Sequence, residues 1–149
     1  MSNGNALSVP GNLTGPNLAQ KRRASYDYSF YFSALAPAAT TTVTKRIQTD
    51  AIFDWYIGTY FADIASAAQT ESTRVIPICT VLIKDLGSSY DLSDAAIPLT
   101  SRFGRGELPY ILSQPYRFPS GGDISITVSN ADPTNTYNIR LVMGGIKIY

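Results

Sequence analysis

The stretch Gln114–Asn130, QPYRFPSGGDISITVSN, contains the clearest local structural signals in the sequence. Pro115 and Pro119 fix the backbone φ angle and remove two amide donors, so the first half is predicted to be an extended or bent corner. The pair Gly121-Gly122 predicts a turn. Asp123–Asn130 then alternates polar and apolar side chains, which indicates a strand with one buried and one solvated face.

Strand signals also occur on the N-terminal side of this stretch. In Ala24–Ser33 four aromatic residues, Tyr26, Tyr28, Phe30 and Phe32, share one parity. Asp27, Ser29 and Tyr31 share the other, so this segment is predicted to be a strand. Thr40–Gln48 is rich in β-branched residues and is predicted to contain one strand or two. Asp50–Ile64 has no single period, and we favour a strand over a helical turn there.

Three later segments complete the pattern. Ser72–Lys84 is an apolar strand candidate, and Pro77 within it indicates an edge position or a bulge. Glu107–Ser113 is a strand candidate that leads into the corner. Tyr137–Tyr149 alternates apolar residues and is predicted to bend at Gly144-Gly145 before the chain ends.

These segments together predict an all-β protein. About seven to nine short strands separated by Gly, Pro, Asn and Asp turns are typical of an antiparallel β-sandwich. Long irregular connections favour a jelly-roll or Greek-key arrangement over a meander. We expect residues 1–23, which show little periodicity, to form a flexible, extended N-terminal arm, and residues 24–149 to form a single β-sandwich domain.

The composition indicates how the surface of the protein is used. Of the 149 residues, 44% are hydrophobic and only 15% are charged, whereas charged residues usually make up about a quarter of a globular domain. A weakly charged surface fits burial against neighbouring proteins, although a small β-protein with a neutral surface fits equally well. The net charge of +1 favours neither nucleic acid nor an acidic partner.

Several kinds of catalytic site are excluded by the residue types present. The sequence has no histidine, which removes Ser-His-Asp and Cys-His nucleophilic sites and His-ligated zinc. The single cysteine, Cys79, lies in an apolar run and is predicted to be a buried, inert thiol. The sequence also lacks a Walker A motif and a G-x-G-x-x-G motif.

Two carboxylate pairs remain as candidates for chemistry. Asp50 and Asp54 lie near Trp55 and could form a glycosidase-like pair, while Asp91 and Asp94 could contribute oxygens to a calcium ion. We favour turn and cap roles for all four. The sequence therefore predicts no enzyme activity, no cofactor, no metal site and no small-molecule substrate.

No membrane association is predicted from the sequence. No stretch approaches the roughly 20 apolar residues of a membrane-spanning helix, and the N-terminus lacks the apolar core of a signal peptide. We expect a protein that is made and used without secretion.

The second half of the chain resembles small virion proteins of tailed bacteriophages, of the capsid decoration (cement) type. The resemblance covers about the last 50 residues and rests on four elements: Arg102-Phe103-Gly104, Leu108-Pro109, Pro115–Asp123 and the strand Ile124–Asn130. It implies a jelly-roll or related β-sandwich, a homotrimer, and binding to the major capsid protein or other virion proteins. The expected location is the virion, assembled in the host cytoplasm.

The function predicted from these observations is the stabilisation of an assembled phage capsid through oligomeric protein–protein contacts. A tail or neck protein is the first alternative. The second is a carbohydrate-binding jelly roll that stacks sugars on Trp55, Tyr56 and Tyr60. Nucleic acid is not an expected partner. The predicted interface residues are basic and aromatic residues in the arm and near turns: Lys21, Arg22, Arg23, Arg102, Phe103, Arg105, Tyr116, Arg117 and Phe118.

Overall fold

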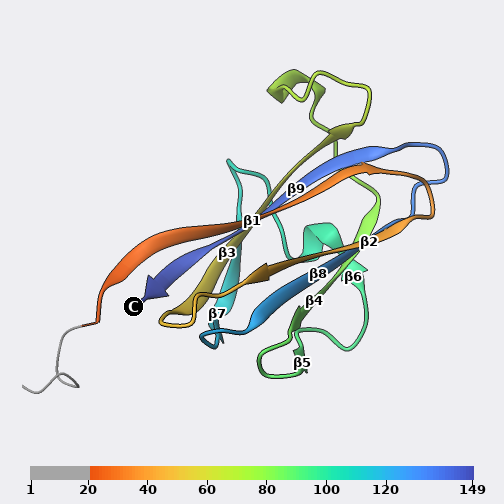
Figure 1. The fold of residues 1–149 in the computed structure, drawn as a ribbon. Helices are drawn as coiled ribbons and strands as arrows, with labels where there is room; N and C mark the ends of the chain where they lie inside the picture. Colours follow the sequence, from red (N-terminus) through yellow and green to blue (C-terminus); the bar gives the residue numbers. More distant parts are fainter. Residues whose placement is uncertain (1–20) are drawn as a thin grey trace, which may run out of the picture.

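The computed structural model describes residues 21–149, which form two antiparallel sheets packed face to face (Figure 1). The predicted all-β sandwich is confirmed. Sheet A contains, in spatial order, β1 (Arg23–Leu35), β9 (Tyr137–Ile148), β3 (Ile52–Ile64) and β7 (Tyr110–Phe118). Sheet B contains β2 (Thr40–Arg46), β8 (Asp123–Asn130), β4 (Cys79–Asp85) and β5 (Tyr90–Asp91), with β6 (Ile97–Pro98) also paired to β4.

The strands pair in a nested order. The first strand pairs with the last, β2 pairs with β8, β3 pairs with β7, and β4 pairs with β5. The chain crosses between the sheets at most connections, which excludes a simple meander. A long hairpin rolled up on itself pairs its strands in this order, and the jelly-roll arrangement stays a prediction.

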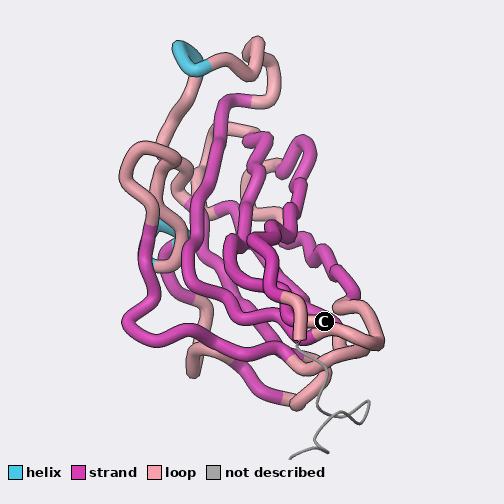
Figure 2. Tube along the Cα trace, turned by 90° about the vertical axis from the view of Figure 1, so that its left-hand side faces the viewer, coloured by secondary structure: helices cyan, strands magenta, loops and turns pink. Residues whose placement is uncertain are grey.

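Helical structure is limited to two short 3-10 turns in the described residues, η3 (Glu71–Thr73) and η4 (Leu99–Ser101). In Figure 2 the loop that carries η3 stands beyond one end of the sheets, while the C-terminus lies toward the other end.

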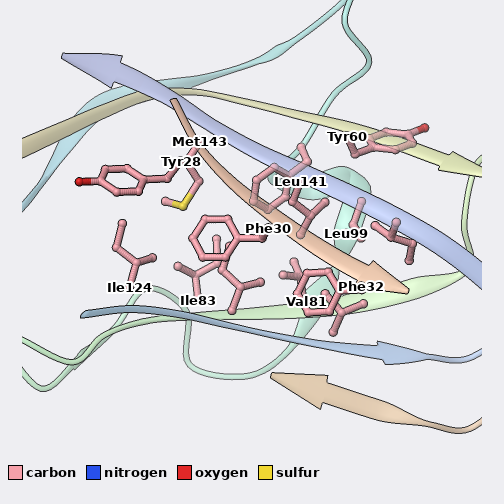
Figure 3. Close-up of a cluster of buried hydrophobic side chains, with 14 of the residues drawn as sticks. Tyr28, Phe30, Phe32, Tyr60, Val81, Ile83, Leu99, Ile124, Leu141 and Met143 are labelled. Atoms are coloured by element: carbon pink, nitrogen blue, oxygen red, sulfur yellow. The ribbon is translucent and has the colours of Figure 1, made fainter. Parts of the chain in front are cut away.

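The hydrophobic core lies between the two sheets (Figure 3). Tyr28, Phe30 and Phe32 of β1 point into it, as the period-2 pattern predicts, and the alternate residues of this strand are exposed. Tyr26 shares their parity but is partly exposed because it lies near the end of the sandwich. Burial of these rings is the main stabilising contribution of β1.

Strand β8 has the bounds that the sequence predicts. Its apolar residues Ile124, Ile126 and Val128 are fully buried, and Thr127 and Ser129 on the other face are partly exposed. The preceding turn is also confirmed, because Gly121 adopts a φ of 75°, which a residue with a side chain rarely adopts. The Gly121 amide donates to the Gln48 carbonyl at 3.1 Å, which docks this turn on the β2–β3 connection.

Residues 114–118 are extended, as one of the two predicted alternatives states, but they belong to β7 and do not form a corner. Trp55 pairs with Tyr116 and Ile57 pairs with Ile111, so residues 112–115 of β7 bulge opposite Tyr56 of β3. Because β7 is an edge strand and Pro115 lies in this bulge, the missing proline amide breaks no ladder hydrogen bond.

Two other local predictions are corrected. Pro77 precedes β4, which begins at Cys79 and lies inside sheet B, so the proline marks neither an edge strand nor a bulge. Strand β9 continues without a break through Gly144 and Gly145, and the irregularity lies on β3.

The predicted boundary of the N-terminal arm also changes. Residues 1–20 of the arm lie outside the described residues. The Arg22 amide donates to the Tyr149 carbonyl at 2.6 Å, the Tyr149 amide donates to the Arg22 carbonyl at 2.9 Å, and Arg23 begins β1. Sheet A therefore begins at Arg23, one residue before the predicted boundary, and Arg22 is hydrogen-bonded to the chain end beside it.

The connection between β8 and β9 is organised by the buried carboxylate of Asp132. It accepts hydrogen bonds from the Thr134 and Asn135 amides, from the Asn135 side chain and from the Tyr137 hydroxyl. These donors, led by the Tyr137 hydroxyl, hold the pKa of Asp132 well below its usual range.

We expect this carboxylate to make stability depend on pH. Its folded-state pKa is lower than the unfolded value near 3.9, so its contribution is complete above that value and is lost as the pH falls. The difference in thermal midpoint between wild type and Asp132→Asn should shrink on acidification from about pH 6 to about pH 2. Asp94→Asn, at an exposed aspartate, is the control; a difference for Asp132→Asn that does not change with pH would contradict this account.

Candidate contact face

The outward side of sheet A, here called the outer face, carries a group of apolar side chains on β9, β3 and β7, next to the polar outward residues of β1. Strand register places Arg23, Ile148 and Ile52 in one row across the sheet, and Asp27, Gly144, Ile57 and Ile111 in another. Ile57 is 37% exposed and Ile111 is 68% exposed. The apolar members of the outer face are Ile52, Tyr56, Ile57, Ile111, Val142, Ile146 and Ile148.

The outer face is apolar because β9 carries apolar residues on both of its sides. Ile139, Leu141 and Met143 point into the core and are fully buried, while Val142, Ile146 and Ile148 alternate with them. Strands that are apolar on both sides normally lie between two covering layers. No second sheet covers the outer face within residues 21–149, so this face has the composition of a contact surface.

A basic hollow of about 470 Å³ lies at the end of the outer face nearest the C-terminus, here called the lower end. Lys21, Arg23 and Arg117 line it together with Asp50. The Arg117 guanidinium donates two hydrogen bonds to the Asp54 carboxylate, at 2.8 and 2.9 Å. This carboxylate raises the pKa of Arg117, whose charge is thus partly compensated. Lys21 and Arg23 supply the remaining positive charge.

The middle of the outer face is a mainly apolar hollow of about 490 Å³, lined by Tyr56, Ile57, Ile146 and the glycine pair, with Ser25 and Asp27 on its β1 side. Gly144 lines the hollow without a side chain, and a Cβ there would lie 3.0 Å from an Asp27 carboxylate oxygen. A third hollow of about 440 Å³ lies at the upper end, over Phe61 and Val142. The three hollows follow one another along β3 and β9, and this row of hollows is here called the trough.

The wall of the upper hollow is held by an ion pair. The Arg74 guanidinium binds the Glu107 carboxylate through both of its terminal nitrogens, at 3.2 and 2.8 Å. The hydrogen bonds from Arg74 lower the pKa of Glu107. Arg140 stacks on the Tyr31 ring at 4.0 Å. The charges at this end therefore have partners within the chain.

The structure brings together only some of the predicted interface residues. Lys21, Arg23 and Arg117 line one hollow, whereas Arg22 lies beside them in the sheet through its pairing with Tyr149. Arg105 lies 3.6 Å from Glu107, near the upper hollow. Arg102 instead donates to the Leu92 carbonyl at 2.9 Å and serves to fix a loop.

Three predicted interface residues belong to the protein interior. Phe103 is fully buried and stacks on Trp55 with ring centroids 6.0 Å apart, and Phe118 is fully buried against Phe53. Because neither ring is exposed, neither can contact a partner, and the predicted interface role of Phe103 and Phe118 is wrong. The half-buried Tyr116 donates its hydroxyl hydrogen bond to Asp85 at 2.8 Å. It therefore closes one end of the core.

The alternative sites named from the sequence are not assembled. Trp55 is 0% exposed and Tyr60 is 5% exposed, so the proposed sugar-stacking surface reduces to Tyr56, at 38%. Asp54 is engaged by Arg117. Residues 21–149 contain no cluster of three or more potential metal-ligating side chains. Burial raises the pKa of the Cys79 thiol to about 11, which fits the predicted inert cysteine.

Comparison with known protein families and with curated proteins returned no match for this chain. Among the described residues, no helix has the length and apolar character needed to cross a membrane.

Proposed function

We propose that this chain is a non-enzymatic structural protein of a phage virion, which stabilises the assembled capsid through oligomeric protein–protein contacts. The observation that carries the proposal is the outer face of sheet A, an apolar trough with exposed Ile57 and Ile111 and no covering layer in residues 21–149. Exposed apolar surface of this kind marks contact sites between proteins.

The physical basis of this function is binding to the assembled state. A protein that binds a closed shell and not its dissociated subunits stabilises the shell by mass action. Oligomerisation of the chain, as a trimer for example, multiplies individually weak contacts through effective concentration. The low charged content of 15% suits surfaces that become buried against other proteins. The major capsid protein is the partner in this proposal, and a tail or neck position is the alternative.

The test is co-sedimentation with shells assembled from the major capsid protein encoded by the same phage genome. Ile57→Lys and Ile111→Lys place a charge on the outer face, and each should weaken binding by roughly 10-fold or more. The matched control is Leu86→Lys, at an exposed leucine next to β4 of sheet B, which should bind like wild type. Equal binding by all three variants would remove the outer face from the proposal.

A further inference from the structure

We propose that the outer face is the docking site for residues Leu7–Leu18 of a second copy of this chain. The proposal rests on the proposed contact role of the outer face and assigns that contact to the oligomer, so the outer face then supports shell binding through oligomerisation. It does not depend on the virion assignment. It makes sheet A a middle layer, covered on its outer side by the N-terminal segment of a neighbour.

The chemistry of the segment matches the trough. The first charged side chain of the sequence is Lys21, so residues 1–20 carry no Asp, Glu, Lys or Arg. The segment does carry Leu7, Val9, Leu13 and Leu18. An uncharged segment can cover Ile146 and Ile57 without bringing a charge of its own into the contact, which would be costly. Its backbone amides can donate hydrogen bonds to the Asp27 carboxylate on the β1 side of the hollow. The apolar middle of the trough therefore favours this occupant over a charged peptide.

The length of the segment also fits. The trough runs along β9 from the row of Ile148 to the row of Arg140, about 27 Å at about 3.4 Å per residue. The extended chain from Leu7 to Leu18 spans about 36 Å. One such segment can thus contact all three hollows.

The point where the segment joins the fold favours a second copy over the same copy. Arg22 is held in line with β1 by two backbone hydrogen bonds to Tyr149, so the described chain points away from sheet A where it begins, at Lys21. Between Lys21 and the first upstream turn signal, Gly15-Pro16, the sequence has no glycine or proline. If the chain turned back at Gly15-Pro16, it would need about six further residues to reach the lower end of sheet A again. Leu13 and Val9 would then fall short of the central hollow of their own copy.

The first test is disulfide trapping with full-length variants. Leu13→Cys and Ile57→Cys are mixed under mild oxidation, and we expect a heterodimer at least roughly 10-fold more abundant than the product of Leu13→Cys with the control Leu86→Cys. The native Cys79 is buried and its raised pKa keeps it unreactive. No excess over the control would overturn the proposal. A double variant that closes an intramolecular disulfide as a monomer would also overturn it, because that product shows docking within one copy.

The second test is complementation in sedimentation experiments. Leu13→Asp damages the segment and Ile57→Asp damages the face, so each variant alone should self-associate roughly 10- to 100-fold more weakly than wild type. A mixture contains one intact segment and one intact face, and it should form a heterodimer. A monomeric wild type, or a mixture that does not associate, would contradict the proposal. Association in these tests without binding to shells would reject only the virion assignment.

Discussion

Replacing Trp55 with alanine should lower the free energy of unfolding by about 3–5 kcal/mol. The Trp55 side chain is fully buried in the core, and its ring stacks on Phe103 with centroids 6.0 Å apart. Its indole N–H donates to the Ile57 carbonyl at 2.7 Å, next to the bulge of β3. The substitution removes the largest side chain among the fully buried residues and also frees a carbonyl beside the bulge.

The measurement is urea denaturation followed by far-UV circular dichroism, with Tyr56→Ala as the matched control. Tyr56 is the next residue and is 38% exposed, so its truncation should cost about 1 kcal/mol or less. The two variants therefore distinguish a core role for Trp55 from a surface role for Tyr56. If Trp55→Ala kept wild-type stability, Trp55 could not be the core residue that we describe, and the sugar-stacking interpretation would regain its main residue.

The strands that sequence reasoning located well are those whose pattern is local. Asp123–Asn130 matches β8 at both ends because a glycine turn precedes it and its apolar residues all meet the core. The aromatic row of β1 was equally clear, since Phe30 and Phe32 alternate with exposed residues. In both cases the period of two reports the two faces of one strand and needs no knowledge of its neighbours.

The features that sequence reasoning missed depend on pairing between distant segments. Arg22 joins the sheet because Tyr149 lies beside it. Pro115 is tolerated inside β7 because the strand lies at an edge and bulges opposite Tyr56. No local pattern contains these partners. The predicted corner therefore assigned Pro115 to a connection, although it lies inside β7, while Pro119 does lie in the connection to β8.

The candidate site was only partly accessible from the sequence. Lys21, Arg23 and Arg117 were named and do meet in one hollow, but Phe103 and Phe118 are buried. Aromatic residues near glycine and proline occur both in exposed turns and at the buried ends of a sandwich. The alternation along a strand also does not say which of its two faces meets the second sheet. The outer face was missed, although one signal was present: the apolar residues of β9 occupy both parities.

The second large effect is expected at Gly145, where β3 and β9 approach each other beside the bulge. A Cβ on Gly145 would overlap the Asp54 carbonyl oxygen and would lie 3.1 Å from the Trp55 Cα. Both obstacles are backbone atoms, so neither can move aside without separating the two strands. We expect Gly145→Ala to cost about 3 kcal/mol or more, because the ladder between the central strands must open where the core tryptophan is anchored.

Two other glycines provide a graded control for this prediction. A Cβ on Gly106 would meet no atom within 4 Å, so Gly106→Ala should change stability by about 0.5 kcal/mol or less. Gly144→Ala should fall between the two, since its 3.0 Å neighbour is the Asp27 side chain, which can rotate away. Urea midpoints should therefore decrease in the order Gly106, Gly144, Gly145, and tryptophan fluorescence should change most for Gly145→Ala. A Gly145→Ala variant as stable as Gly106→Ala would show that β3 and β9 do not approach each other so closely. In that case the central hollow, whose floor is this glycine pair, would also have a different shape.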